Sequence, residues 1–261
     1  MNRFLSLCFC VCAVLLSGCR TGTSTSVCCP ACSSVPQDKH DTYILVHGAW
    51  GGGWDWKNID HLLTADGNTV YRPTLTGLGE HSNLDNTNID LETHIEDIVN
   101  VIVWENLHDV VLAGHSYGGM VITGVADRVP DRIKRLVYID AFLPENGDSV
   151  EKPFGWPKIP IKDGYLTVPW LTNTPPPPHD VLMPARAFSQ PINLTNQAVA
   201  LELPATYILA VDPGTNLEQA HFYLSYCRAK SRGWPLHVIA SDHNVQRSHP
   251  HELVKFMEAS P

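Results

Sequence analysis

The stretch Leu112–Met120, "LAGHSYGGM", decides the fold, because it predicts a strand that turns abruptly into a helix. Upstream, residues 109–114, "DVVLAG", form a short valine-rich apolar run that is typical of a buried strand. Downstream, residues 118–129, "GGMVITGVADRV", carry apolar side chains at helical spacing. Glycines lack the Cβ atoms that would collide in such a sharp turn, and they stand here at positions 114, 118 and 119.

Ser116 stands at the centre of this turn in a G-x-S-x-G pattern. In a nucleophile elbow, a strained turn of this kind holds a serine hydroxyl exposed above the edge of a sheet. A glycine-rich connection with a chance serine is the alternative interpretation, because short motifs also occur without the function. We therefore expect Ser116 to be a nucleophile and look for its partners elsewhere in the chain.

Length and composition fit one large globular domain. The chain has 261 residues, of which 44% are hydrophobic and 17% charged, and its formal net charge is -9. An acidic chain with no basic run is a poor candidate for binding nucleic acid. Seven of the eight cysteines fall in the first 32 residues, so the fold cannot depend on an internal disulfide. The segment "CCPAC" contains C-x-x-C, but no second pair with zinc-site spacing accompanies it, so we expect no metal site.

The N-terminus has the layout of a secretory signal peptide. Residues 1–18 hold one positive charge, an apolar run too short to span a membrane, and then small residues. The end of this segment, "LLSGC", resembles the lipobox of bacterial lipoproteins, which implies a lipid anchor at Cys19 and export to a bacterial membrane. Arg20, in place of aspartate, favours the outer membrane or cell surface; an ordinary signal peptide is the alternative. Residues 19–40 are small and polar and predict a flexible tether.

Residues 41–261 alternate between apolar strands and amphipathic helices. Strands are predicted at "TYILVHG", "NTVYRPTL", "IKRLVYIDAF", "ATYILAVD" and "PLHVIASDH", in addition to the strand before Ser116. Helices are predicted at "WDWKNIDHLLTADG", at "DLETHIEDIVNVIVWENL" with Asp90 as N-cap, and at "HPHELVKFMEA". This alternation predicts an α/β fold with a mostly parallel sheet and helices on both faces.

Residues 144–203 interrupt the alternation. They are rich in proline, including "TPPPPHD", and proline disfavours strands and helix interiors. A disordered linker is the alternative, but Trp156, Trp170, Phe188 and Leu201 provide apolar surface to bury. We expect an irregular, partly helical cap over the carboxyl end of the sheet, where substrate contacts are commonly found.

His243 is the expected general base. A serine hydroxyl needs a base to accept its proton, and the base needs an orienting acid; on a sheet of this kind the chain order is serine, acid, histidine. His243 follows the last strand and precedes the last helix, as that order requires. His115 lies in the elbow, where the turn should point its side chain away from the serine. The other candidates fit less well, because His237 lies within a strand and His249 and His251 begin the last helix.

Two aspartates compete for the orienting acid. Asp212 ends the strand "ATYILAV" and is our first choice, because that is the expected location. Asp140 ends the preceding strand, "RLVYI", where some hydrolases of such a fold place their acid. Glu145 and Glu218 are further possibilities. The acid must fix the imidazole tautomer and stabilise its charged form, so geometry decides between them.

Acyl transfer also needs N–H donors for the oxyanion that develops on the attacked carbonyl. The N–H of Tyr117, directly after the serine, is the first candidate. The second should come from the loop "HGAWGGGW" after the first strand, where the N–H of Ala49 is best placed. Gly48 and the other glycines of this loop let its backbone approach a substrate closely.

Four segments together resemble a known family: "YILVHGAWGGGWDW", "AGHSYGGMV", "RLVYIDAFLPENGDS" and "IASDH". They are similar to the α/β-hydrolase branch that contains plant methylesterases, hydroxynitrile lyases and bacterial carboxylesterases. The resemblance runs from about Thr42 to Met257 and is weakest in residues 150–203. It implies the α/β-hydrolase fold and a cofactor-free Ser-His-Asp enzyme with a capped, mainly apolar pocket.

The resemblance also implies roles for individual residues. It makes Ser116 the nucleophile and His243 the base, and it assigns the oxyanion-hole donors to Ala49 and Tyr117. Asp212 carries over less cleanly, because the alignment around "VDPGTNLEQ" can slip by one residue.

Two positions separate the esterases of this branch from its lyases. Similar hydroxynitrile lyases carry threonine after the histidine of "HG" and lysine after the catalytic histidine, whereas this chain has Gly48 and Asn244. Gly48 leaves room for an oxyanion, and the missing lysine removes the cation that would stabilise departing cyanide. Both differences favour ester hydrolysis.

We therefore expect a serine carboxylesterase that cleaves a small-molecule ester through an acyl-enzyme intermediate. The alternatives are a hydrolase-fold ligand-binding protein, a lyase with little ester turnover, and a surface adhesin. Membrane contact is expected only through the anchor at Cys19. The expected substrate pocket comprises Gly48, Trp50, His115, Phe142, Trp156 and Asn244, with Trp54 and Trp170 as further aromatic candidates.

Overall fold

The structure is a computed structural model that describes residues 40–154, 159–168, 170, 171, 173 and 175–259. The expected signal peptide, residues 1–18, and all of the tether at 19–40 except His40 lie outside these ranges. Within the described residues, no helix combines the length and the apolar character needed to cross a lipid bilayer.

A six-stranded sheet forms the centre of the domain, and every neighbouring pair in it is parallel. Its strand order is β2-β1-β3-β4-β8-β9. The bounds are β1 Thr42–Val46, β2 Thr69–Tyr71, β3 Val110–His115, β4 Ile133–Ile139, β8 Ala205–Val211 and β9 Leu236–Ala240. The predicted parallel sheet is confirmed, and the carboxyl ends of β3, β4 and β8 meet at one edge.

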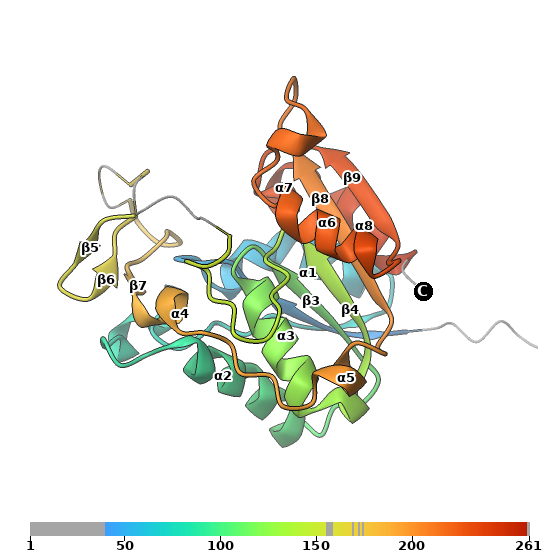
Figure 1. Cartoon of the computed structure of the whole chain (residues 1–261), viewed down its shortest axis with the longest axis horizontal. Helices are drawn as coiled ribbons and strands as arrows, with labels where there is room; N and C mark the ends of the chain where they lie inside the picture. The colour runs from blue at the N-terminus through green and yellow to red at the C-terminus, as the bar shows by residue number, and fades with distance from the viewer. Residues whose placement is uncertain (1–39, 155–158, 169, 172, 174, 260–261) are drawn as a thin grey trace, which may run out of the picture. The chain divides into compact units, whose positions relative to one another are not determined.

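Helices cover both faces of this sheet, as predicted (Figure 1). One face carries α2 (Leu91–Trp104), α3 (Gly118–Arg128) and α6 (Tyr223–Ser231), and the other carries α1 (Lys57–Ala65) and α8 (Pro250–Glu258). Successive strand residues point to opposite faces, so neighbouring side chains of β1 bury themselves in different cores. Ile44 packs in the core under α2 and α3, whereas Leu45 packs in the core under α1 and α8.

Between β4 and β8 the chain leaves the main sheet and forms the insertion expected at 144–203. It contains a small antiparallel sheet and two short helices, which Figure 1 shows to one side of the main sheet and along α2 and α3. The antiparallel sheet was not expected, because strands of two residues leave no periodic pattern in a sequence. Its elements are β5 Ile161–Lys162, β6 Tyr165–Leu166, β7 Met183–Pro184, α4 Arg186–Ser189 and α5 Gln197–Ala200.

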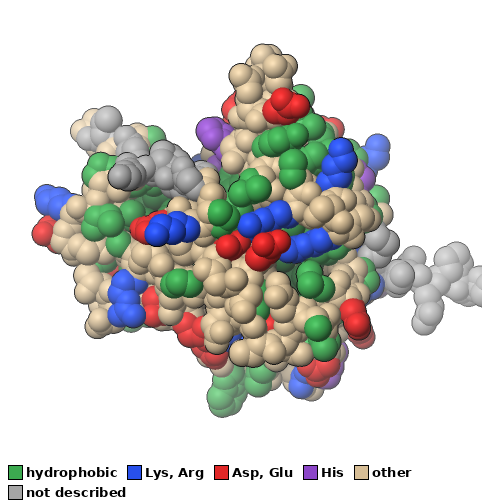
Figure 2. Space-filling model, in the orientation of Figure 1, with side chains coloured by type: hydrophobic (Ala, Val, Ile, Leu, Met, Phe, Trp, Pro, Cys, Tyr) green, Lys and Arg blue, Asp and Glu red, His purple; other side chains and the backbone are tan. Residues whose placement is uncertain are grey.

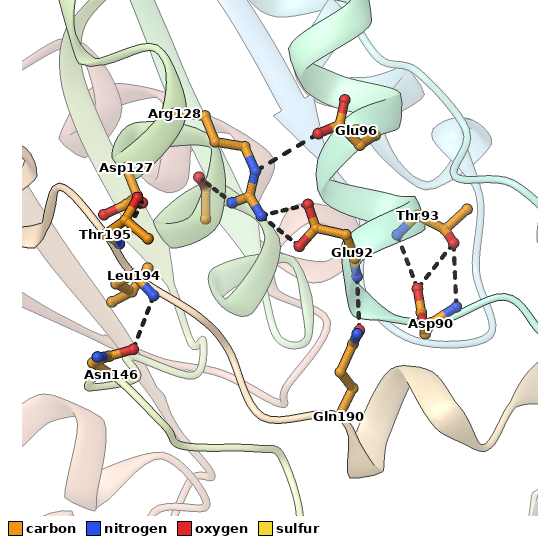
Figure 3. A network of polar contacts seen from close by, with 11 residues as sticks. Asp90, Glu92, Thr93, Glu96, Asp127, Arg128, Asn146, Gln190, Leu194 and Thr195 are labelled. Atoms are coloured by element: carbon orange, nitrogen blue, oxygen red, sulfur yellow. Dashed lines mark hydrogen bonds and ion pairs between the residues drawn. The ribbon is translucent and has the colours of Figure 1, made fainter.

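Hydrogen bonds fasten the returning part of the insertion to α2 and α3 (Figure 3). The Asp127 carboxylate on α3 accepts from the N–H of Thr195 at 2.9 Å and of Asn196 at 2.7 Å. At the start of α2, the N–H of Glu92 donates to the side-chain oxygen of Gln190 at 2.9 Å. The insertion is therefore held on the helices that also pack behind the elbow.

Basic and acidic side chains are interspersed on the face shown in Figure 2. An ion pair joins α6 to the insertion: the Arg228 guanidinium donates to the Asp148 carboxylate at 2.6 Å and to the Leu143 carbonyl at 2.9 Å. Arg228 is largely shielded from solvent, so this ion pair stabilises more than a fully exposed pair would.

Two buried histidines hold the loop that follows β2. His47, directly after β1, hydrogen-bonds through Nδ1 to the Gly48 carbonyl at 2.7 Å and through Nε2 to the Leu75 N–H at 3.1 Å. His94 on α2 donates through Nε2 to the Thr76 carbonyl at 3.0 Å, and its Nδ1 lies 2.9 Å from the Tyr117 hydroxyl. Each ring thus uses one nitrogen as donor and the other as acceptor, which requires the neutral form. Burial lowers the pKa of both histidines to about 4.

These histidines should make the fold sensitive to acid. The unfolded chain protonates each one near its ordinary pKa of 6.5, whereas the folded protein resists protonation down to about 4. The stability that each neutral histidine contributes is therefore fully present above pH 6.5 and is lost as the pH falls toward 4. The loss in the free energy of unfolding is roughly 2 to 3 kcal/mol per histidine at pH 4.5. Urea unfolding at pH 7 and 4.5 measures this loss. His94→Gln should reduce the difference in free energy of unfolding between pH 7 and pH 4.5, whereas the exposed control His251→Gln should not. The same difference in wild type and both variants would contradict the assignment.

Candidate active site

Ser116 sits in a strained turn between β3 and α3, with a left-handed backbone at φ +54°. The N–H groups of Gly119 and Phe142 both donate to its carbonyl at 3.1 Å, which fixes the turn from two sides. A Cβ on Gly119 would lie 2.0 Å from the Phe142 carbonyl oxygen, so the elbow requires glycine there. Ser116 is 6% exposed and lines a cavity of about 300 Å³.

His243 follows β9 and contacts a carboxylate through Nδ1, which leaves Nε2 available to act as a base. Its Nδ1 lies 2.5 Å from Oδ2 of Asp140, and both His243 and Ser116 line the cavity. With Asp140 ionised, Nδ1 carries the donated proton, and the lone pair of Nε2 is left to accept another. This is the tautomer that a general base for a serine needs.

Asp140 is held in place by the sheet. It directly follows β4 with φ +43°, is 2% exposed, and accepts a hydrogen bond from the N–H of Ala210 on β8 at 3.1 Å. Burial raises the pKa of its carboxyl, and the hydrogen bonds from His243 and Ala210 act in the opposite direction. The same two hydrogen bonds compensate for removing the carboxylate from water.

In this structure Asp140, the alternative acid, contacts His243, whereas Asp212, our first choice, forms no hydrogen bond or ion pair with it. The N–H of Ser116 donates to the carbonyl of Ile139 at 3.3 Å, so the end of β4 lies against the elbow. Asp212 ends β8, one strand further away, and is exposed in a turn where its carbonyl accepts from Thr215. Neither of the other acids pairs with His243: Glu145 lies 3.8 Å from Arg228, and Glu218 is exposed in the turn Leu217–Gln219.

The two expected oxyanion donors have free N–H groups. Within the described part of the chain, the N–H groups of Ala49 and Tyr117 donate to no protein acceptor. The hydrogen bond from His47 holds the Gly48 carbonyl, and in a trans peptide the N–H of the next residue points the opposite way. His47 therefore fixes the direction of the Ala49 N–H.

Gly48 lies against Ser116, which agrees with the need for a small residue at this position. A Cβ at this position would lie 3.1 Å from Cβ of Ser116 and 3.2 Å from Nδ1 of His115. Any side chain there would crowd the serine and the space in front of it.

The cavity beside Ser116 contains most of the expected pocket residues. Gly48, Trp50, His115 and Asn244 line it, as does Trp170 from the insertion. Trp156 lies outside the described residues. The full lining is Gly48, Ala49, Trp50, Asp55, His115, Ser116, Trp170, Asp180, His243, Asn244 and Arg247.

Two of the expected aromatic residues do not line this cavity. Phe142 is 2% exposed and packs in the core, with its ring centroid 4.9 Å from those of Phe154 and Phe222. Its hydrogen bond to the elbow carbonyl turns this stretch inward, which the sequence does not indicate. Trp54 instead lies under the Arg247 guanidinium, 4.8 Å from its ring centroid.

His115 lines the cavity, as expected of a pocket residue. It is 3% exposed, and its Nε2 donates to the carbonyl of His243 at 2.8 Å. Burial lowers its pKa well below the ordinary value, so the ring is neutral and Nδ1 carries no proton. That nitrogen is buried and has no partner among the described residues.

Three charged residues that line the cavity were not predicted from the sequence. Asp55 follows the first strand, Asp180 lies in the insertion, and Arg247 belongs to the short helix α7 (Val245–Ser248). Each is close to a predicted motif, but no local pattern indicates that the three meet at one cavity. In the described ranges, no group of three His, Cys, Asp or Glu side chains is arranged to hold a metal ion.

Curated relatives match the chain over part of its length. It is 54% identical to the Carbendazim hydrolyzing esterase of Nocardioides sp. (strain SG-4G) over 108 residues, which are 41% of this chain and 45% of that protein. It is 33% identical to Methylesterase 2 of Arabidopsis thaliana over 129 residues, 48% of each protein. An α-hydroxynitrile lyase of the same plant is 31% identical over 105 residues, 40% of each. These alignments span less than half the length of the curated relatives.

Solved structures match nearly the whole described domain. An extracellular α/β-hydrolase from a Paenibacillus species superposes with a TM-score of 0.68 at 25% identity, covering 84% of this chain and 98% of that chain. A pyrethroid hydrolase from Sphingobium faniae JZ-2 superposes with a TM-score of 0.64 at 24% identity, covering 85% and 97%. The second likeness shows the fold alone.

The family model agrees with the fold and with the elbow. The model of the alpha/beta hydrolase family matches residues 43–256, which include every strand of the main sheet except the first residue of β1. The chain belongs to the alpha/beta hydrolase family.

Proposed function

We propose that this protein is a serine carboxylesterase that cleaves small carboxylic esters. One observation carries the proposal: the 2.5 Å contact between Asp140 and His243 at the cavity that contains the elbow serine. The arrangement supplies a nucleophile, a base in the required tautomer and an acid that fixes it.

The first half-reaction forms an acyl-enzyme. Ser116 Oγ attacks the ester carbonyl while His243 Nε2 takes its proton, and Asp140 stabilises the resulting imidazolium. The N–H groups of Ala49 and Tyr117 donate to the oxyanion of the tetrahedral intermediate. His243 then gives its proton to the leaving alkoxide, and the alcohol departs.

The second half-reaction restores the enzyme. Water attacks the acyl carbonyl and gives its proton to His243, and the same two N–H groups hold the second oxyanion. Collapse of that intermediate breaks the bond to Ser116 Oγ, which recovers the proton from His243 as the carboxylic acid leaves. No step requires a cofactor.

Names of the relatives support ester hydrolysis over the alternatives. They include a carbendazim-hydrolysing esterase and several methylesterases, each matched over less than half its length. Because one relative is a hydroxynitrile lyase, lyase activity is the alternative to ester hydrolysis. The open position at Gly48 and the neutral Asn244 in place of lysine favour the esterase. A ligand-binding protein or an adhesin would not need the Asp140–His243 pair.

We also propose that the protein is exported and anchored by lipid at Cys19. The support is the order of charge, apolar run and "LLSGC" in residues 1–19. The anchor would leave the hydrolase domain on a tether at a bacterial membrane.

The nucleophile is tested by Ser116→Ala. Removal of the attacking oxygen should lower kcat/KM for p-nitrophenyl acetate and butyrate by at least about 10⁴-fold, with an unchanged circular dichroism spectrum. Retained turnover in the purified, folded variant would contradict the proposal.

The acid is tested by a matched pair of substitutions. Asp140→Asn should lower kcat by on the order of 10³- to 10⁴-fold, because the amide no longer favours the Nδ1–H tautomer of His243. Asp212→Asn removes the same charge from an exposed turn and should stay near wild type. The assignment fails if Asp212→Asn is the more damaging change.

The anchor is tested by Cys19→Ser in a bacterium that processes lipoproteins. The wild-type protein should be recovered with membranes, and the variant should move to the soluble exported fraction. Identical fractionation of the two proteins would contradict the proposed lipid anchor and would leave the esterase proposal unaffected.

A further inference from the structure

The cavity beside Ser116 is lined by three charged side chains that the proposed mechanism does not use. Asp55 and Arg247 form an ion pair, and Gln246 adds a hydrogen bond to the same carboxylate at 3.1 Å. The Arg247 guanidinium also lies over the Trp54 ring. Its charge is therefore already balanced by a carboxylate and an aromatic face.

Asp180 forms no ion pair in the described part of the chain, although its charge acts on Arg247 at longer range. Its Oδ2 accepts a hydrogen bond from the Trp170 indole N–H at 2.8 Å. Among the described residues, no cation lies within ion-pair distance of this carboxylate. The described lining holds two aspartates and one arginine, so its carboxylates outnumber its guanidinium and favour a net negative charge.

The position of Asp180 is fixed from both sides. The N–H of Val181, the next residue, donates to the carbonyl of Trp50 at 2.9 Å. Trp50 belongs to the loop that carries the Ala49 N–H, and its ring meets that of Trp170 edge-on with centroids 5.0 Å apart. A carboxylate and two indole rings therefore stand together in the cavity of the nucleophile.

A second group in the lining also lacks a partner and offers a lone pair. Nδ1 of His115 is buried, unprotonated and without a hydrogen bond in the described part of the chain. The Trp50 indole N–H also has no partner among the described residues. The lining holds no unpaired positive charge in the described part of the chain, because Arg247 is paired with Asp55.

We propose that the cavity selects esters whose non-reacting part carries an organic cation. A carboxylate beside indole rings attracts such a group by charge and by cation–π interaction. An anionic group would instead be repelled by the net negative charge of a lining with two aspartates and one arginine. The proposal rests on the proposed esterase function, because the bound cation positions the ester at Ser116.

The cation preference is measured with two esters of nearly the same shape. Acetylcholine carries a quaternary ammonium, and 3,3-dimethylbutyl acetate has a neutral carbon in its place. The ratio of their kcat/KM values does not depend on the fraction of active protein. Asp180→Asn keeps an acceptor for Trp170 but loses the charge, so it should lower this ratio by about tenfold. The exposed control Asp212→Asn should leave the ratio and the basal activity unchanged.

Salt and binding provide independent readouts. In wild type the ratio should fall at 0.5 M NaCl, because salt screens a partly exposed charge. An equal ratio in wild type and Asp180→Asn would overturn the cation preference while Ser116-dependent turnover still supported the esterase. If p-nitrophenyl acetate is not turned over either, the esterase proposal fails and the cation preference fails with it. If p-nitrophenyl acetate is turned over but neither of these two esters is, tryptophan fluorescence titration of Ser116→Ala with both esters decides the preference. Tighter binding of acetylcholine that Asp180→Asn abolishes supports it, and equal binding overturns it.

Discussion

The candidate site depends on the contact between Asp140 and His243. It joins residues 103 positions apart, and it exists because β3, β4 and β8 are neighbours with their carboxyl ends at one edge. The elbow at Ser116 bonds to the end of β4, and β8 supplies the N–H of Ala210 that holds the second carboxylate oxygen. The sheet register thus sets the geometry of the acid and the base together.

The parts around this contact are fixed by buried neutral histidines. His47 orients the peptide that presents the Ala49 N–H, and His94 holds the Tyr117 side chain while contacting the loop after β2. His115 holds the backbone of His243. Each uses one nitrogen to donate to a carbonyl, and the other nitrogen of His47 accepts from the Leu75 N–H, a hydrogen bond that protonation would remove. The structure around the site therefore relies on the low pKa values that burial produces.

The insertion adds what the main sheet cannot provide. Its returning segment is fastened to α2 and α3 by Asp127 and Gln190, and Val181 is bonded to the loop after β1. These attachments bring Trp170 and Asp180 to the cavity. The proposed catalytic groups follow strands of the main sheet, whereas the insertion adds one carboxylate, Asp180, and one indole, Trp170, to the cavity.

Local patterns in the sequence were sufficient for the strands of the main sheet, for the elbow and for α1, α2, α3 and α8, because each depends on a few neighbouring residues; they did not indicate α6. They could not choose between Asp140 and Asp212, since both end apolar strands that are adjacent in the sheet. The choice depends on which strand lies against the elbow, a long-range property. The same holds for Phe142, which packs inward after a bend, and for Asp55, Asp180 and Arg247, which meet from three distant segments. The strands of the insertion are too short, at two residues each, to produce a periodic pattern of apolar residues in the sequence.

The most direct test of the central contact is the protonation state of His243, observed by NMR of protein labelled with ¹⁵N-histidine. At pH 8 we expect His243 to carry its proton on Nδ1, with that proton far downfield because it is shared with a carboxylate. The signal should be lost in Asp140→Asn and retained in Asp212→Asn. A proton on Nε2, or a downfield signal that depends on Asp212, would contradict the account.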